Sequence, residues 1–352
     1  MNGSLVYDDY LNLCKNKNII GLNNKIKQIQ PSSVDLSLSS ECYEIKASFL
    51  SPKNKVREKL KKILIKKINL SKPVIFKKNK TYIVKLSESL NLNSSIKGHC
   101  NPKSSTGRLN VFCRTILDYC DEYEKIPNNY KGEMFLEITT RSFDIKFSEG
   151  DKLNQMRLVY KSNNYLTDKQ LIKIHKKNSL IMSKKNNIIE NGLKVSADLS
   201  NNNKVCAYVS KSSSSYIDFS KINFYNNKKF WKPLKPINKT LIIEKDKFYI
   251  LKSKEKIRIP NDLAGEMIPY DTGIGDFRVH YAGFFDPGFG DPKGSFAVLE
   301  IKTNELPFMI EDGQTIARIK YEKLNKKTSV VYGASIESNY QNQKLALSKH
   351  FK

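Results

Sequence analysis

The segment HCNPKSSTGRLNVF, residues 99–112, combines the groups that bind phosphate. Adjacent hydroxyls, the backbone N–H groups of a tight turn and a guanidinium can all donate to phosphate oxygens, and a lysine adds a point charge. Serine, threonine and glycine are also common in ordinary polar turns, so the segment alone does not decide between the two interpretations. The candidate phosphate contacts are Lys103, Ser104, Ser105, Thr106, Gly107 and Arg108.

A second segment, VHYAGFFDPGFGDP at residues 279–292, has the composition of a sharply turning loop. Its aromatic residues suit stacking on a flat ring while Asp286 accepts a hydrogen bond from a sugar or base. The alternative is a packed β-turn whose aromatics belong to the core. Glu300 follows on a strand whose same-face neighbours are Phe296 and Val298. A carboxylate on an apolar face has a raised pKa, as a general base near neutrality requires, whereas a solvated glutamate at a sheet edge has no such role.

The carboxyl-terminal segment VYGASIESNYQNQKLALSKHFK offers Tyr332, Tyr340, Gln343 and Lys344 as groups that can close over a ligand as a lid. Chain ends are usually loose, so this segment by itself assigns no function.

The sequence lacks the H-x-E…P-C-x-x-C set of zinc-dependent deaminases. His99 and Cys100 are only an adjacent pair, and His175, His280 and His350 have no partner at metal-ligand spacing, so we expect no zinc. The six cysteines show no C-x-x-C pattern, which favours reduced thiols without disulfides. No apolar run approaches the roughly 18 residues of a membrane span. We therefore expect a cytoplasmic protein with no membrane partner.

The chain has 61 Lys and Arg against 35 Asp and Glu, a net charge of +26. Such a charge invites a nucleic-acid interpretation. However, only 8 of the basic residues are arginine, the side chain that reads bases and phosphates in a planar, bidentate way. The lysines accompany abundant asparagine and isoleucine, which favours a compositional bias spread over solvated faces. We expect no specific nucleic-acid partner.

The elements that must position these groups recur along the chain. KNKTYIVKL and KDKFYILKS place Tyr82 and Tyr249 at the same offset, and FLEI, FSEG and MRLVY are followed in the same order by VLEI, IEDG and ARIKY. SVDLS around Asp35 is likewise echoed by SADLS around Asp198. Several blocks in one order indicate an internal duplication.

These blocks read as short strands rich in β-branched and aromatic residues, which favours an all-β barrel or sandwich in each half. Two short exceptions are VYDDYLNLCKNKN, a candidate N-terminal helix, and KVREKLKKILIKK, whose apolar residues have near-helical spacing. The Lys/Asn-rich stretch 161–192 lacks strand alternation and is the expected connector between domains at 1–160 and 193–352.

Together, QPSSVDLSL (30–38), KSSTGR (103–108), the Asp-Pro-Gly turn at 286–288, the Leu-Glu strand and the YQNQ tail resemble the dCTP deaminases of the trimeric dUTPase superfamily, in their double-length branch. The resemblance covers both halves. It implies two tandem dUTPase-like barrels (β-clip, distorted jelly roll) with a few short helices. It also implies an enzyme that converts dCTP to dUTP and ammonia and so supplies dUTP for dTTP synthesis.

The resemblance assigns roles residue by residue. Ser104 and Arg108 take the places of the family's catalytic serine and arginine, with Lys103 where arginine is usual. The catalytic glutamate, which follows Val298 and Leu299, is Glu300, and Asp286 lies near the deoxyribose and base. Family lid residues map to Tyr332 and Gln343, while the lid lysine falls on Asn339, with Lys344 close by. Mg²⁺ is implied only through the substrate triphosphate, dTTP as an inhibitor, and a homo-oligomer as the assembly.

Each half of the sequence lacks one of the two turns, the phosphate turn or the Asp-Pro-Gly turn, that the other half keeps. The second half has Ile-Pro-Tyr-Asp at 268–271 where the phosphate turn belongs, and the first has Lys-Ile-Pro-Asn-Asn-Tyr at 125–130 where the Asp-Pro-Gly turn belongs. Because the related trimers build sites between subunits, the resemblance implies one composite site per pair of unlike halves. Glu300 is then the working base, and Glu137 in FLEI a relic or a supporting residue.

Three alternatives stay open. Within the fold, a dUTP diphosphatase uses an aspartate to activate water toward phosphorus, but the Gly-rich tail of those enzymes is missing here. A bifunctional enzyme would convert dCTP to dUMP. From another class, a non-catalytic basic β-barrel protein would bind nucleic acid with a steep salt dependence and release no ammonia.

Overall fold

The computed structural model of the chain describes residues 2–162, 165–182, 188–268, 277–279, 283–303, 306–335 and 340–352, without the side chains of residues 26 and 277–279. The chain divides into two compact units. Unit 1 comprises Met1–Asn163, Ser213–Tyr225 and Leu324–Ser329, and unit 2 comprises Asn164–Ser212, Asn226–Lys323 and Val330–Lys352. In the part of the chain that is described, no helix has the length and apolar character needed to cross a bilayer.

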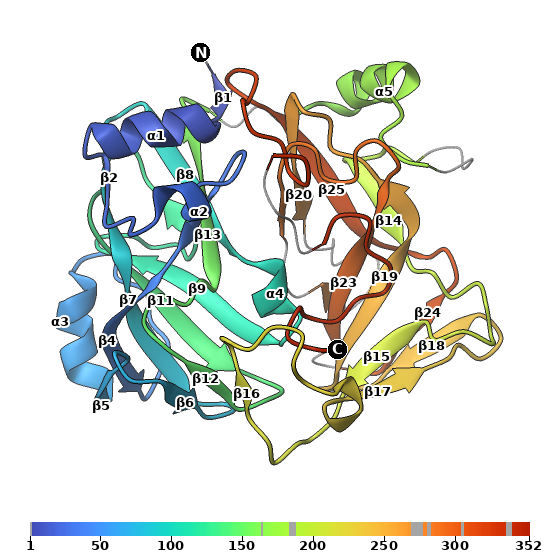
Figure 1. Cartoon of the computed structure of the whole chain (residues 1–352), viewed down its shortest axis with the longest axis horizontal. Coiled ribbons are helices and arrows are strands. Elements are labelled where there is room, and N and C mark those ends of the chain that lie inside the picture. The colour runs from blue at the N-terminus through green and yellow to red at the C-terminus, as the bar shows by residue number, and fades with distance from the viewer. Residues whose placement is uncertain are drawn as a thin grey trace. The chain divides into compact units, whose positions relative to one another are not determined.

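Unit 1 is built from mostly antiparallel sheets and a few short helices (Figure 1). Its helices are α1 (Tyr7–Lys15), α2 (Lys25–Gln28), α3 (Val56–Ile63) and α4 (Ser104–Gly107). Its strands are β1 (Gly3–Ser4), β2 (Ile19–Ile20), β3 (Val34–Leu36), β4 (Leu38–Ile45), β5 (Leu64–Asn69), β6 (Val74–Phe76), β7 (Thr81–Asn91), β8 (Ile96–Pro102), β9 (Val111–Leu117), β10 (Lys125–Ile126), β11 (Lys131–Thr140), β12 (Ile145–Phe147), β13 (Asn154–Tyr160) and β16 (Ile217–Asp218).

The largest sheet of unit 1 has the order β5-β4-β7-β11-β9, with β2 beside β7. A second sheet runs β1-β13-β8-β10, with β3 beside β13. In the third sheet, β16 pairs in parallel with β12, so a short segment from the second half of the sequence completes a sheet of unit 1. Pairing between elements this far apart in sequence is not visible in local patterns.

Helix α3 covers one face of the large sheet, because Val56 and Leu60 pack against Ile83, Ile116 and Phe135. The helix expected in KVREKLKKILIKK ends at Ile63, after which β5 pairs with β4. The apolar spacing continued past this point, but the free edge of β4 offers a hydrogen-bonded ladder that a longer helix would forgo. The expected N-terminal helix is confirmed as α1.

Unit 2 is likewise built from small sheets and a few short helical segments. Its sheets run β14-β25-β20-β22, β17-β15-β19-β23-β21 and β18-β24. Its helices are α5 (Asp168–Lys177), which lies within the expected connector, and the 3₁₀ turn η1 (Asn227–Lys229). Its strands are β14 (Leu193–Ser196), β15 (Ala207–Ser210), β17 (Trp231–Leu234), β18 (Thr240–Ile243), β19 (Phe248–Ile257), β20 (Leu263–Ile268), β21 (Phe277–Val279), β22 (Phe284–Phe285), β23 (Ser295–Thr303), β24 (Phe308–Glu311) and β25 (Thr315–Lys323).

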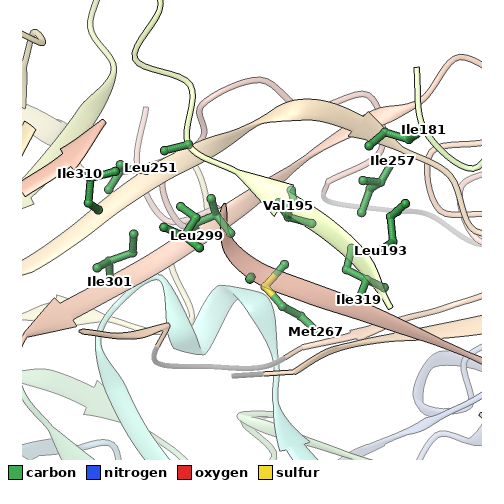
Figure 2. Close-up of a cluster of buried hydrophobic side chains, with 14 of the residues drawn as sticks. Ile181, Leu193, Val195, Leu251, Ile257, Met267, Leu299, Ile301, Ile310 and Ile319 are labelled. Carbon is green, nitrogen blue, oxygen red and sulfur yellow. The ribbon is translucent and has the colours of Figure 1, made fainter. Parts of the chain in front are cut away.

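The core of unit 2 lies between these sheets, where aliphatic side chains from several strands meet (Figure 2). Leu299 and Ile301 of β23, Leu251 of β19 and Ile319 of β25 are all fully buried there. The strands expected from FYILKS, SFAVLEIKT and IARIKY are confirmed, since each forms part of β19, β23 or β25. The expectation of all-β halves with a few short helices is therefore confirmed.

Some hydrogen bonds recur in the two units at corresponding positions. The Tyr82 hydroxyl accepts a bond from the Lys77 N–H at 3.1 Å, and the Tyr249 hydroxyl accepts one from the Glu244 N–H at 3.0 Å. These pairs share the sequence offset of the repeated blocks, so the local geometry repeats along with the residues.

Candidate functional site

The phosphate-binding candidate in unit 1 is a single helical turn, α4, that follows β8. The Lys103 carbonyl accepts bonds from the N–H groups of Thr106 at 2.9 Å and Gly107 at 3.0 Å, which closes the turn. Arg108 at its end is only 3% exposed. The buried Thr106 hydroxyl has no hydrogen-bond partner among the described residues. An unsatisfied buried donor is costly, so this turn is suited to an additional acceptor such as an anionic oxygen.

Lys103 is held at the start of α4 by an ion pair with Asp35, a buried residue of β3. The Lys103 N–H also bonds the Leu153 carbonyl at 2.9 Å, which brings Lys152 close to the turn. The pKa of Lys152 is lowered, chiefly by burial and further by the charges of Lys103 and Lys27, while Asp35 and Glu88 oppose the shift. Lys103 and Lys152 thus lie near this turn together with the Asp35 carboxylate, which offsets part of their positive charge.

The loop that carries Asp286 in unit 2 is tied to the end of β19. The Gly288 N–H bonds the Ile259 carbonyl at 3.0 Å, and the Ile259 N–H bonds the Phe289 carbonyl at 2.8 Å. Asp286 itself is 8% exposed. The rings of Phe285 and Phe289 pack edge-on at 5.0 Å. The described aromatics of this loop therefore pack within unit 2 and stiffen the turn.

Gly288 is required by the close approach of the tail. Its φ of +95° lies in the left-handed region, and a Cβ at this position would fall 2.3 Å from Cγ1 of Val331. The neighbouring Tyr332 N–H bonds the Pro287 carbonyl at 2.9 Å, and the Tyr332 ring lies 5.9 Å from that of Phe289. Tyr332 is thus placed against the base-side loop.

Glu300 lies on β23 opposite Ile250 of β19 and is 5% exposed. Leu299 is fully buried, while Val298 and Phe296 are half-buried. Strand β23 thus places Glu300 on a face that it shares with Phe296, Val298 and the buried Lys302. The Lys252 ammonium lies 4.3 Å from the centroid of the Phe296 ring.

Glu137, the corresponding glutamate of unit 1, has a different environment. One of its oxygens accepts two bonds from Arg114, from Nε at 3.1 Å and Nη2 at 2.6 Å. Its other oxygen accepts a bond from the Ser48 hydroxyl. The Arg114 guanidinium in turn lies 3.7 Å from the centre of the Tyr123 ring. Glu137 is 1% exposed, so its contacts with Arg114 and Ser48 make it part of the packed interior of unit 1.

The tail packs against unit 2. Nε2 of Gln343 donates to the Phe296 carbonyl at 2.8 Å, and Tyr340 is buried, whereas Lys344 is exposed. Gln341, which the sequence did not single out, bonds the backbone of the loop after Asp286. Gln341 lies two residues before the predicted Gln343 in the Y-Q-N-Q segment.

The candidate residues fall in both units. Residues 103–108 and Asp35 lie in unit 1, and Asp286, Val298, Leu299, Glu300, Tyr332, Tyr340, Gln343 and Lys344 lie in unit 2. Asn339, His280 and residues 269–271 lie outside the described part of the chain. Asp35 and Arg114 were not predicted as partners of Lys103 and Glu137, because each pair depends on strand pairing.

The six cysteines are buried free thiols. Within the described residues, no three His, Cys, Asp or Glu side chains come together as ligands for a metal ion.

Comparison with known proteins gives the family. The N-terminal domain model of 2′-deoxycytidine 5′-triphosphate deaminase matches residues 1–162, and its C-terminal domain model matches residues 167–351. Among solved structures, the 2′-deoxycytidine 5′-triphosphate deaminase from Agrobacterium tumefaciens is similar, with a TM-score of 0.90 and 36% identity over 95% of this chain and 99% of that one. No curated protein matches. The chain therefore belongs to the 2′-deoxycytidine 5′-triphosphate deaminase family of enzymes.

Proposed function

We propose that the chain hydrolyses dCTP to dUTP and ammonia, with Glu300 as the general base and no metal at the reacting carbon. The observation that carries this assignment is the state of the other repeat glutamate. Glu137 is buried and held by an ion pair with Arg114 and a hydrogen bond from Ser48, which supports a structural role for it in unit 1. We assign the base to Glu300, which follows the loop of Asp286 on β23.

In the proposed reaction, Glu300 takes a proton from a water molecule as the water oxygen attacks C4 of cytosine. The bond between C4 and the exocyclic nitrogen then breaks. The carboxyl passes this proton to the departing amine, so that ammonia leaves. The second proton of the water moves from the C4 hydroxyl to N3, so that the product has a carbonyl at C4 and an N3–H. Ser104 and Arg108 donate hydrogen bonds that position the substrate and stabilise developing negative charge. The absence of the H-x-E…P-C-x-x-C set in the sequence supports a route without zinc.

The surroundings of each candidate residue support a proposal for the part of dCTP that it contacts. The triphosphate is proposed to bind α4 and Lys103, where the Thr106 hydroxyl lacks a partner among the described residues. Asp286, beside the Phe285 and Phe289 rings, is proposed to accept a hydrogen bond from the deoxyribose or base. Val298 and Leu299 precede Glu300 on its strand, and Tyr332, Asn339, Tyr340, Gln343 and Lys344 are proposed as tail contacts.

We further propose that the working site draws Ser104 and Arg108 from the N-terminal half and Glu300 from the C-terminal half. The support is that each half keeps one set and lacks the other, as a duplicated ancestor that divided its functions would leave them. Domains at 1–160 and 193–352, a homo-oligomer, inhibition by dTTP, a cytoplasmic location and Mg²⁺ carried on the substrate triphosphate stay predictions.

The experiment incubates chelator-treated protein with dCTP and Mg²⁺ and follows ammonia, dUTP and pyrophosphate. Ammonia with stoichiometric dUTP is the expected result. Release of pyrophosphate from added dUTP, without ammonia from dCTP, would identify a dUTP diphosphatase. Release of both ammonia and pyrophosphate would identify a bifunctional enzyme. Salt-dependent binding of long DNA without turnover of dCTP would favour the nucleic-acid-binding alternative.

A further inference from the structure

The side-chain amide of Gln341 makes three hydrogen bonds to one loop backbone. Its oxygen accepts from the Gly290 N–H at 2.9 Å. Its nitrogen donates to the Gly288 carbonyl at 3.2 Å and to the Asp291 carbonyl at 3.4 Å. One N–H and two carbonyls face the amide, so the oxygen and nitrogen each have one favourable orientation. Gln341 therefore acts toward this loop as a neighbouring backbone strand would.

The same loop is also held by Arg258. Arg258 donates from Nε to the Asp291 carboxylate at 3.1 Å, and its Nη2 bonds the same oxygen. Arg258 also bonds the Ser179 carbonyl at 3.0 Å, so this anchor belongs to the body of unit 2. The Gln341 side chain holds the same loop from the tail.

The tail that carries Gln341 is itself secured further along. The Phe351 ring packs 5.6 Å from Phe230 and 6.0 Å from Trp231, and His350 is fully buried. A tail held at its end cannot drift freely, so the Gln341 contact is made at a high effective concentration.

We propose that Gln341 is a positioning residue for substrate, which holds the loop of Asp286 in the conformation that binds the base and sugar of dCTP. The inference rests on the proposed function, because it takes Asp286 as a substrate contact. Gln341 acts through the loop, so its loss weakens binding more than it slows the chemical step.

The test compares Gln341→Ala and Gln341→Glu with the wild-type enzyme in steady-state deamination of dCTP. For Gln341→Ala we expect KM to rise roughly tenfold with kcat nearly unchanged. Gln341→Glu keeps the acceptor but loses the donor, so KM rises at neutral pH. On acidification the introduced carboxyl gains a proton it can donate, and the ratio of its KM to that of the wild type falls. A merely structural role would not produce this pH-dependent rescue.

Gln314→Ala serves as the control, because Gln314 also bonds a backbone N–H, that of Glu311 at 3.0 Å, but in a turn away from the tail. Its KM should match the wild type. A wild-type KM in Gln341→Ala, or a KM ratio for Gln341→Glu that does not change with pH, contradicts the inference. If the wild-type protein releases no ammonia from dCTP, it is the proposed function that fails.

Discussion

The half-buried Arg114 forms an ion pair with the buried Glu137 in unit 1, with the guanidinium stacked on Tyr123. Helix α3 and the residues before it cover the same face of the sheet, where Ser48 completes the contacts of the carboxylate. The glutamate that corresponds to the proposed base has thus become part of a packed interior. The similar blocks FLEI and VLEI thus have different proposed roles, because different residues surround Glu137 and Glu300.

The Arg114–Glu137 pair should matter for stability and not for catalysis. Arg114→Ala leaves a buried carboxylate without its cation, which we expect to lower the free energy of unfolding by about 3 kcal/mol. Adding Glu137→Leu should recover most of this loss, because it removes the stranded charge. Denaturant unfolding of the wild type, both single variants and the double variant measures the coupling. A double variant no more stable than Arg114→Ala would contradict this account of the pair.

Asp35 is expected to support substrate binding through Lys103. In Asp35→Asn the Lys103 ammonium loses its ion-pair partner, while the positive charge of Lys152 remains nearby. Lys103 should therefore move away from the turn. We expect KM for dCTP to rise several-fold with little change in kcat. Asp144→Asn, which removes the partner of Lys77 elsewhere in unit 1, is the control. Equal KM values in both variants would argue against a role for Asp35.

Gly288 and Gly150 provide a matched pair of glycine substitutions. Both have positive φ, +95° and +86°, but only at Gly288 would an added Cβ meet other atoms. Gly150→Ala should therefore cost about 1 kcal/mol of stability through backbone strain alone. Gly288→Ala should cost more and also raise KM, because Val331 must shift and the loop moves with it. Melting temperatures and KM of the two variants check this, and equal effects would count against it.

The stability of the protein should depend on pH through Glu88. Burial raises the pKa of Glu88 to about 7, against hydrogen bonds from Gln28 and Ser37 that oppose the rise. The folded state thus holds this proton more tightly than the unfolded chain, where the pKa is about 4. The contribution is complete below that value and is lost as pH rises toward 7.

Glu88→Gln should therefore flatten the decline of the melting temperature between about pH 5 and pH 8. Thermal melts of the wild type and the variant across this range are the measurement. Replacement of the exposed Glu149 by Gln is the control and should leave the slope unchanged. An unchanged slope in Glu88→Gln would mean that this carboxyl does not titrate in the range.

Local pattern was enough for much of the fold. SFAVLEIKT predicted a strand that the structure has at Ser295–Thr303, because β-branched and aromatic residues bounded by glycine specify a strand without help from distant contacts. KVREKLKKILIKK was only partly predictable, since the switch from α3 to β5 depends on the edge that β4 provides. The pairing of β16 with β12 joins segments too far apart for any local signal.

The candidate site was likewise predictable only where its residues are consecutive in sequence. The phosphate turn and the base-side loop could be identified because their chemistry lies in consecutive residues. The partners Asp35 and Arg114 could not, because Asp35 meets Lys103 and Arg114 meets Glu137 only through strand pairing. Gln343 was predicted as a tail contact and Gln341 was not, because only the packed tail shows that the Gln341 amide contacts the loop of Asp286.

The most direct test of the central claim is the rate of ammonia release from dCTP by Glu300→Gln and Glu137→Gln, each first shown to be folded. Loss of a general base costs roughly 10²–10⁴-fold, so Glu300→Gln should fall by that factor. Glu137→Gln should stay close to the wild-type rate. Near-normal activity in Glu300→Gln together with an inactive Glu137→Gln would contradict the assignment of the base to the C-terminal half.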